Sequence, residues 1–204
     1  MTGHVKMMAF AALFCTMGMV TGCNESAENC DACETMTDSH DGTVYKTIKI
    51  GDQIWMAENL NVVMEDSWCY ENKPDNCKKY GRLYSWDMAM SACPEGWHLP
   101  SKDEFETLFA TVGGQPTAGK MLKSKKGWKK SGNNTNEFFF SALPAGIRLV
   151  EGKFLNEDLY AYFWTSTDYG NDGAYNMYLD NGSDRGFLFD DLRVNGRSVR
   201  CLKN

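Results

Sequence analysis

The sequence predicts an α+β domain, because helical patterns fill the first half of the chain and short strand patterns fill the second. A first helix is predicted over residues 80–93, where apolar side chains stand at helical spacing: Leu83, Trp86, Met90 and Cys93. A second helix is predicted from Ser101, which forms a capping-box pattern with Glu104 ahead of the apolar residues Phe105, Leu108 and Phe109.

Short strands and turns account for the rest of the pattern. Residues 44–50 and 54–56 flank the turn Gly51-Asp52 and predict a hairpin. Residues 120–136 are polar and predict a long surface loop around Trp128. Further strands are expected at residues 138–143, 161–166, 174–179, 187–189 and 198–202, separated by turn signals such as Asn195-Gly196.

The N-terminus carries an export signal. An apolar run of about fourteen residues follows Lys6, which suits a signal-peptide core and is too short to span a bilayer. The sequence VTGC that ends at Cys23 resembles the lipobox of bacterial lipoproteins, so we expect residues 1–22 to be a signal peptide and Cys23 to be lipidated. An ordinary cleaved signal is the alternative. Asn24 is not the Asp that retains well-studied lipoproteins at the inner membrane, which favours the outer membrane.

A spacer and one domain follow the signal. Residues 23–42 are polar and almost free of apolar side chains, which predicts a flexible tether. Residues 43–204 are long enough for a single core and form the expected domain. The chain is 43% hydrophobic and 24% charged with a net charge of -6, and it has no large basic cluster, so nucleic acid is not an expected partner.

Disulfides are the expected state of the remaining cysteines. Of 8 cysteines, Cys15 leaves with the signal and Cys23 carries lipid, which leaves an even number in an oxidising compartment: Cys30, Cys33, Cys69, Cys77, Cys93 and Cys201. Spacing alone does not choose among the connectivities that these allow. A zinc site is the alternative, but the single CxxC has no second one to complete a four-ligand set. That CxxC also lacks the strand and helix of a thioredoxin motif, so a local disulfide is preferred.

Four separated blocks carry a resemblance to a known family. They are GDQIWMAENL at residues 51–60, YGRLYSW at 80–86, CPEGWHLP at 93–100 and SVRC at 198–201. In this order they resemble the Fibrobacter succinogenes major paralogous domain (FISUMP). Members of that family are commonly exported lipoproteins, in agreement with the lipobox.

The family is similar in turn to the C-type lectin-like fold, and this likeness implies a disulfide pattern. Residues 86–93 would be that fold's first helix, residues 99–108 its second, and residues 164–166 the start of its strand region. Cys201 would stand in the last strand, where the fold places the partner of the first-helix cysteine. The resemblance therefore implies Cys93–Cys201, leaving Cys69–Cys77 and Cys30–Cys33 as local bridges.

The candidate sites are a possible cation turn and a set of aromatic rings. The calcium-binding triplets Glu-Pro-Asn and Trp-Asn-Asp of lectins are absent, and Asp180 and Asp184 lack the further acids of an EF-hand, so calcium is not the favoured cofactor. Trp128, Tyr169 and Tyr175 lie in or beside expected loops and are the proposed sugar-stacking residues. Four other tryptophans are assigned to the core: Trp55, Trp86, Trp97 and Trp164.

No catalytic constellation is visible. The motifs Gly-x-Ser-x-Gly and His-Glu-x-x-His and a phosphate loop are absent, and His98 in its Trp-His-Leu-Pro turn is expected to be structural. We therefore expect a lipid-anchored surface binding or adhesion module without catalysis, with polysaccharide as the first choice of ligand. The alternatives are a protein–protein interaction module and a cysteine-dependent oxidase related to the formylglycine-generating enzymes, which share the lectin-like fold.

Overall fold

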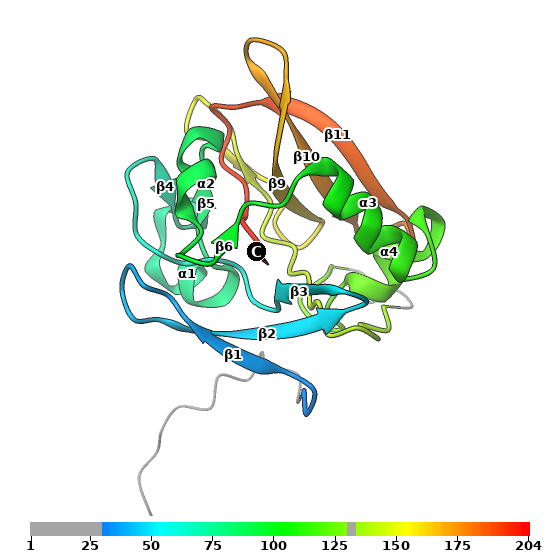
Figure 1. Ribbon diagram of the computed structural model, residues 1–204. Helices are drawn as coiled ribbons and strands as arrows, with labels where there is room; N and C mark the ends of the chain where they lie inside the picture. Colours follow the sequence, from blue (N-terminus) through cyan, green and yellow to red (C-terminus); the bar gives the residue numbers. More distant parts are fainter. Residues whose placement is uncertain (1–29, 130–133) are drawn as a thin grey trace, which may run out of the picture.

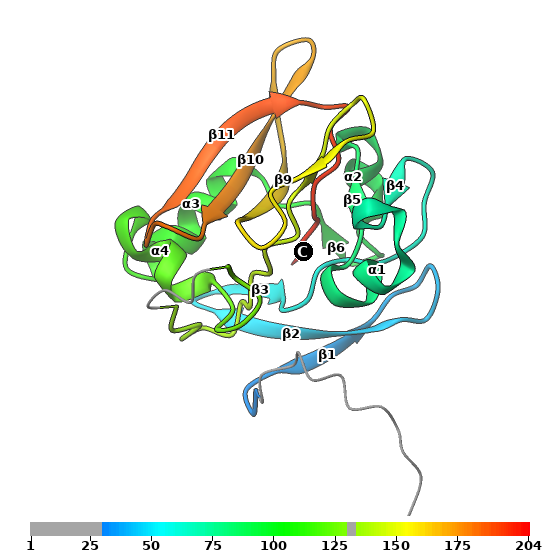
Figure 2. The same ribbon diagram turned by 180° about the vertical axis from the view of Figure 1, so that it is seen from behind.

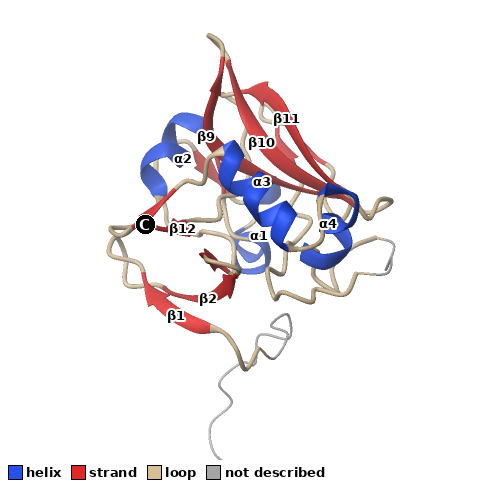
Figure 3. Ribbon diagram, turned by 45° about the vertical axis from the view of Figure 1, so that its right-hand side comes forward, coloured by secondary structure: helices blue, strands red, loops and turns tan. Residues whose placement is uncertain are grey.

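A computed structural model of the chain describes residues 30–129 and 134–204. The expected signal peptide and Cys23, the expected lipidation site, lie outside these residues. The described chain is a mixed α+β domain of helices and antiparallel strands, which confirms the predicted class (Figure 1, Figure 3). Nowhere in these two ranges is there a helix with the length and hydropathy needed to cross a membrane.

A five-stranded antiparallel sheet forms the base of the domain in Figure 1. Its order is β1 (Glu34–Thr37), β2 (Val44–Ile50), β3 (Gln53–Met56), β12 (Leu202–Lys203) and β6 (Trp97–His98). The predicted hairpin is therefore confirmed as β2 and β3, with Ile48 opposite Trp55. Because β12 pairs with β3, the two ends of the domain meet in one sheet.

Strand β1 lies in the segment that was expected to be a flexible tether. Its residues Glu34–Thr37 pair antiparallel with Val44–Thr47 of β2, so the spacer prediction is wrong for this stretch. Asp38, just beyond the strand, is buried and accepts hydrogen bonds from the backbone N–H and the ring of His40. A polar segment can form a strand here because β1 is an edge strand: its backbone pairs with β2, while most of its side chains are exposed.

The first predicted helix is confirmed over only half of its length. The structure has α1 (Pro74–Tyr80), the short strand β5 (Leu83–Tyr84) and then α2 (Trp86–Ala92), with a 3₁₀ turn at Tyr70–Asn72 before them. Gly81 separates α1 from β5 with a φ of 73°, and a Cβ there would lie 2.7 Å from the Cβ of Asn59. Close approach to residues 59–60 thus breaks the helix that the apolar spacing predicts.

The second predicted helix is present as α3 (Lys102–Thr111). Ser101 and Glu104 form the expected capping box. Partial burial raises the pKa of Glu104, but hydrogen bonds from Ser101 and His98 outweigh it, and the net pKa is lowered. His98 bonds Asn204 through Nδ1 and Glu104 through Nε2, which fits its expected structural role.

A three-stranded sheet forms the other half of the domain. Its order is β11 (Gly186–Leu192), β10 (Gly173–Asp180) and β9 (Tyr160–Tyr169), which confirms the strands expected near residues 161–166, 174–179 and 187–189. Helices α3 and α4 (Gln115–Leu122) lie across one face, as Figures 1 and 2 show from opposite sides. Two small sheets complete the fold: β4 (Ser67–Trp68) with β5, and β7 (Ile147–Arg148) with β8 (Phe154–Leu155).

The strand predicted at residues 138–143 is absent. Asn136, Phe139 and Ser141 have φ values of 47°, 53° and 53°, which an extended strand does not allow. This irregular path directs the carbonyls of Phe140 and Ser141 toward Arg200. The strand expected at residues 198–202 is likewise reduced to β12 at its end.

Arg200 is fully buried, and its guanidinium is enclosed by acceptors. It donates to Asn59 Oδ1 at 2.6 Å, to the carbonyl of Met56 at 3.1 Å, to that of Ser141 at 3.0 Å, and to that of Phe140. The ring of Phe140 lies 4.8 Å from the guanidinium carbon. Burial lowers the pKa of Arg200 to about 9. The hydrogen bonds of this cation connect the segment before β12 with the end of β3 and with the loop before residue 142.

All three expected disulfides are present: Cys30–Cys33, Cys69–Cys77 and Cys93–Cys201. The resemblance therefore gave the correct pairing where spacing left it open. Cys93–Cys201 fastens the end of α2 to the residue before β12, across 108 positions of sequence. Cys69–Cys77 closes a separation of only 8.

We predict that the long bridge contributes more stability than the short one. Chain entropy assigns about 5 kcal/mol to Cys93–Cys201 and about 2.5 kcal/mol to Cys69–Cys77. The double variant Cys93→Ala/Cys201→Ala should therefore lose about twice as much free energy of unfolding as Cys69→Ala/Cys77→Ala in urea denaturation. Equal losses in the two variants would contradict the prediction.

Candidate functional site

The two faces of the three-stranded sheet differ in their side chains. Successive strand residues point to opposite faces. One set is apolar and packs into the core with α3 and α4: Ala161, Phe163, Met177, Leu179 and Leu188. The other set is aromatic and belongs to the face that Figure 2 presents, with the helices behind: Tyr160, Tyr162, Tyr178 and Phe187.

A groove of about 420 Å³ runs over the aromatic face. We call it the tyrosine groove, and its lining consists of Asn156, Tyr160, Tyr162, Asn176, Tyr178, Phe189, Asp190, Asp191 and Arg197. Phe189 at its edge is 62% exposed. A single exposed apolar side chain is ordinary, but Phe189 adjoins the rings of Tyr160, Tyr162 and Tyr178 in one lining, and contiguous patches of this kind are typical of binding surfaces.

The rings of the groove hold one another in place. Tyr178 lies directly opposite both Tyr162 of β9 and Phe187 of β11 in the strand register. Tyr160 and Tyr162 stack at 5.4 Å between centroids, and Tyr178 and Phe187 stack at 4.7 Å. Burial raises the pKa of Tyr162 and of Tyr178, so both hydroxyls stay protonated at neutral pH. The groove thus combines apolar ring surface with hydroxyl groups.

A buried ion pair forms one side of the groove. Arg197 is 2% exposed, donates from Nη1 to Asn176 Oδ1 at 3.2 Å, and donates from Nη2 to Asp191 Oδ2. Its guanidinium carbon lies 4.7 Å from the ring of Tyr162 and 4.8 Å from that of Trp164. Burial lowers the pKa of Arg197 to about 10, although Asp191 opposes the shift.

Asp191 is held from several sides. Its Oδ1 accepts a hydrogen bond from the Asn195 side chain at 3.1 Å and one from the backbone N–H of Leu192 at 2.6 Å. Its Oδ2 is the partner of Arg197. The side chain is still 32% exposed, so the carboxylate has both a fixed position and contact with solvent.

Tyr169 and Tyr175 lie together, but they are not part of the groove lining. Their rings meet edge to face at 5.1 Å, and Tyr169 is 49% exposed. The ammonium of Lys102 lies 5.6 Å from the ring centroid of Tyr175. These two predicted residues therefore form a second aromatic surface near the β9–β10 turn.

The prediction that Trp128 exposes its ring in a surface loop is wrong. The residue is 7% exposed, and its indole N–H donates to Ser124 Oγ at 3.1 Å. Helix α4 occupies the start of the expected loop, and Trp128 packs into the main core cluster behind it. A ring enclosed in this way offers no face to a sugar.

The acidic turn of Asp180 and Asp184 is occupied by a lysine rather than arranged for calcium. Lys123 is buried, and its ammonium donates to the carbonyls of Asp180 and Ser183, each at 2.8 Å. The Asp180 carboxylate accepts from the N–H of Gly182 within the turn. Within the described ranges, no three His, Cys, Asp or Glu side chains gather in a way that would hold a metal ion. The residues do not fit a calcium site.

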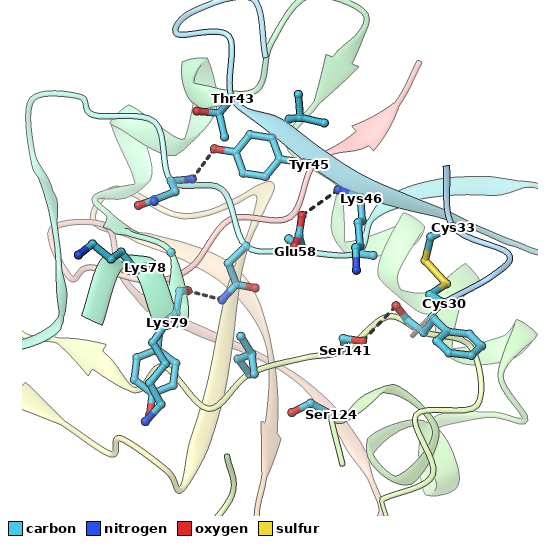
Figure 4. A pocket seen from close by; sticks show the side chains of 18 of the residues that line it. Cys30, Cys33, Thr43, Tyr45, Lys46, Glu58, Lys78, Lys79, Ser124 and Ser141 are labelled. Carbon is cyan, nitrogen blue, oxygen red and sulfur yellow. Dashed lines mark hydrogen bonds between the residues drawn. A yellow bond between two sulfur atoms is a disulfide. The ribbon is translucent and has the colours of Figure 1, made fainter. Parts of the chain in front are cut away.

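A second hollow of about 220 Å³ lies beside the Cys30–Cys33 bridge (Figure 4). It is bounded by β2, by the end of α1 and by the loop at residues 139–143. Much of its polar lining is used internally: Glu58 accepts from the Lys46 N–H at 2.8 Å, and the Tyr45 hydroxyl accepts from the Asn61 N–H at 2.9 Å. The Asn61 amide oxygen is buried without a hydrogen-bond partner among the described residues.

The fold and the groove together define a class: a disulfide-bonded α+β domain with an aromatic groove on one sheet. Residues 48–203 match the model of the Fibrobacter succinogenes major domain, and the chain belongs to this family. No curated protein and no solved structure matches the chain.

Most of the groove was missed from the sequence. The alternation of Tyr160 and Tyr162 signals an aromatic strand face, but it does not show which strands lie beside it. Arg197 and Asp191 gave no local signal, because their pairing depends on the path of the C-terminal segment across β9 and β10.

We predict that Tyr45, in the second hollow, makes stability fall at high pH. Burial raises its pKa from 10.0 to about 12. A raised tyrosine pKa gives stability that is present below pH 10 and lost as the pH rises through 12, on the order of 2 kcal/mol here. Tyr45→Phe should cost about 1 kcal/mol at neutral pH by removing an acceptor for the Asn61 N–H.

The measurement is the free energy of unfolding of both proteins between pH 8 and 12. Wild type should lose its advantage over Tyr45→Phe across this range. Arg197 and Arg200 titrate with the opposite sign in both proteins and cancel in the difference. Parallel curves would show that Tyr45 is not the titrating group.

Proposed function

We propose that the protein is a lipid-anchored cell-surface module that binds polysaccharide through the tyrosine groove and does not catalyse a reaction. The observation that carries the proposal is the continuous row of aromatic rings on the open face of β9, β10 and β11. Pyranose rings have apolar C–H faces that stack on such surfaces, while their edges carry hydroxyl groups for hydrogen bonds.

Preorganisation supports this proposal. Ring-to-ring stacking and strand pairing hold Tyr160, Tyr162 and Tyr178 before a ligand arrives, so little side-chain entropy would be lost on binding. Amide and carboxylate groups beside the rings can form hydrogen bonds that orient a sugar. One of these amides, Asn156, already donates from Nδ2 to the Tyr162 hydroxyl at 3.1 Å and so fixes that hydroxyl. The pair Tyr169 and Tyr175 is proposed as a secondary contact for a longer chain.

The C-type lectin-like fold is part of the proposal. Helix α2 ends at Cys93, which is bonded to Cys201 next to β12, and α3 follows in the place of that fold's second helix. The strand β9 contains Trp164-Thr165-Ser166 at the expected position. These three correspondences support the likeness, and the ligand class follows from the groove rather than from the fold.

Lipid anchoring and an outer-membrane location complete the proposal. The lipobox at Cys23 carries the anchor, and the three disulfides are typical of a compartment outside the cytoplasm. The rival oxidase would need a cysteine thiol for its chemistry, whereas the six cysteines in the described ranges are paired with one another. A protein-binding module is the rival that a ligand experiment must separate.

We predict that glycan binding depends on the aromatic groove. The purified mature domain is applied to an array of plant, fungal and bacterial polysaccharides, and hits are measured by titration. Phe189→Ala removes the most exposed ring and Tyr178→Ala the central one, so each should weaken the affinity at least tenfold, with the larger loss for Tyr178→Ala.

The controls separate the groove from other surfaces. Val63→Ala changes a side chain that is 75% exposed and does not line the groove, and it should bind as wild type does. Tyr169→Ala and Tyr175→Ala should have smaller effects than Tyr178→Ala. Absence of binding to every glycan would refute the polysaccharide proposal. Binding that survives both groove variants would place the site elsewhere.

A further inference from the structure

The charged side chains of the tyrosine groove differ in how accessible they are to a ligand. The lining residues of the groove include one cation, Arg197, and the acids Asp190 and Asp191. Asp191 shares its face of β11 with Phe187 and Phe189, whereas the Asp190 side chain alternates with them and stands opposite Tyr175, outside the groove. Because Arg197 is 2% exposed and Asp191 is 32% exposed, the charged group that the groove presents to a ligand is a carboxylate.

The single cation is not available to a ligand. Arg197 is 2% exposed, and its two terminal nitrogens are engaged by Asn176 and Asp191. Its remaining nitrogen, Nε, is buried without a hydrogen-bond partner among the described residues. An anionic sugar would have to break the ion pair with Asp191 to reach the guanidinium, which would cost the contact that this buried cation already makes.

The accessible polar atoms of the groove are instead mainly acceptors. The Asp191 carboxylate is 32% exposed and is held by Arg197, Asn195 and the Leu192 N–H. A carboxylate fixed in this way accepts hydrogen bonds from sugar hydroxyls, and charged acceptors give the stronger bonds. The Asp191 carboxylate repels the carboxylate of a uronic acid that takes the place of such a hydroxyl.

We infer that the tyrosine groove selects neutral polysaccharides over acidic ones, with Asp191 as the specificity-determining acceptor. This inference rests on the proposed function and narrows its ligand class. The ligand it describes is a chain of neutral pyranose units whose C–H faces lie on the tyrosine rings and whose hydroxyls donate to Asp191.

The test compares the affinities of neutral and acidic polymers by affinity electrophoresis. Mixed-linkage β-glucan and glucomannan are the neutral probes, and polygalacturonate and alginate are the acidic ones. Wild type should bind at least one neutral polymer at least tenfold more tightly than either acidic polymer at low salt. The difference between the affinities for neutral and acidic polymers should decrease as salt screens the repulsion between the carboxylates.

Two variants test the carboxylates. Asp191→Asn keeps the shape of the side chain, and it should weaken neutral binding about tenfold and reduce the preference. Asp190→Asn removes the same charge from the opposite face of β11, so it serves as a neighbouring control and should change the preference less than Asp191→Asn does. If Asp191→Asn fails to fold, the salt dependence of wild-type binding still tests the repulsion. Asp52→Asn in the β2–β3 turn removes the same charge outside the groove lining and should leave both affinities unchanged.

The outcomes distinguish this inference from the proposed function. Acidic polymers that bind more tightly than neutral ones, with binding lost in Phe189→Ala, would overturn the selectivity and leave the groove as the site. A preference that stays unchanged in Asp191→Asn would overturn the role of this carboxylate. No binding to any polymer would overturn the proposed function and this inference together.

Discussion

The buried guanidinium of Arg200 is the contact on which the rest of the domain depends. A cation with no exposed surface is tolerated only when its donors are satisfied, and here the acceptors come from Asn59, from the end of β3 and from the loop at residues 140–141. That loop adopts left-handed backbone conformations at Phe139 and Ser141, which bring its carbonyls to the cation. The burial of one charge thus fixes a segment with no regular secondary structure.

The C-terminal segment at residues 197–201 connects the site of Arg200 with the tyrosine groove. Backbone carbonyls of residues 197, 198, 199 and 201 accept hydrogen bonds from the N–H groups of Tyr84, Trp164, Leu60 and Met56, so one short stretch connects three separate parts of the chain. Cys201 adds the covalent link to Cys93. Arg197 lies at the other end of the stretch and positions Asp191. The groove is therefore built on the most constrained part of the molecule, as a preorganised binding site requires.

Local patterns predicted the elements that depend on local chemistry. The β2–β3 hairpin, the capping box of α3 and the strands β9 to β11 are each encoded within about ten residues, and each was found where it was expected. The disulfides followed from the family resemblance, because no local rule pairs Cys93 with Cys201. Two of the regions that were predicted wrongly depend on distant partners: residues 138–143 on Arg200, and Trp128 on the packing behind α4. Strand β1 pairs with its neighbour β2, and it was missed because its polar residues carry no apolar strand pattern.

The distinction between local and distant contacts also explains which parts of the candidate site could be predicted from the sequence. Aromatic residues late in the chain were visible as composition, but only the strand register shows that Tyr162, Tyr178 and Phe187 form one row while Tyr169 and Tyr175 lie apart. The charge selectivity that we propose had no signal in the sequence. It rests on the burial of Arg197, which pairs the one cation of the groove lining with Asp191.

The most direct test of this account is an NMR titration of the mature domain with a neutral oligosaccharide cut from a polymer that it binds. Aromatic ring resonances report stacking, and backbone amide resonances report the surrounding strands. The account predicts the largest shifts at Tyr162, Tyr178 and Phe189, with smaller ones at the amide of Asp191 and its neighbours. Shifts that reach saturation only at Tyr169 and Tyr175, or beside the Cys30–Cys33 bridge, would contradict it.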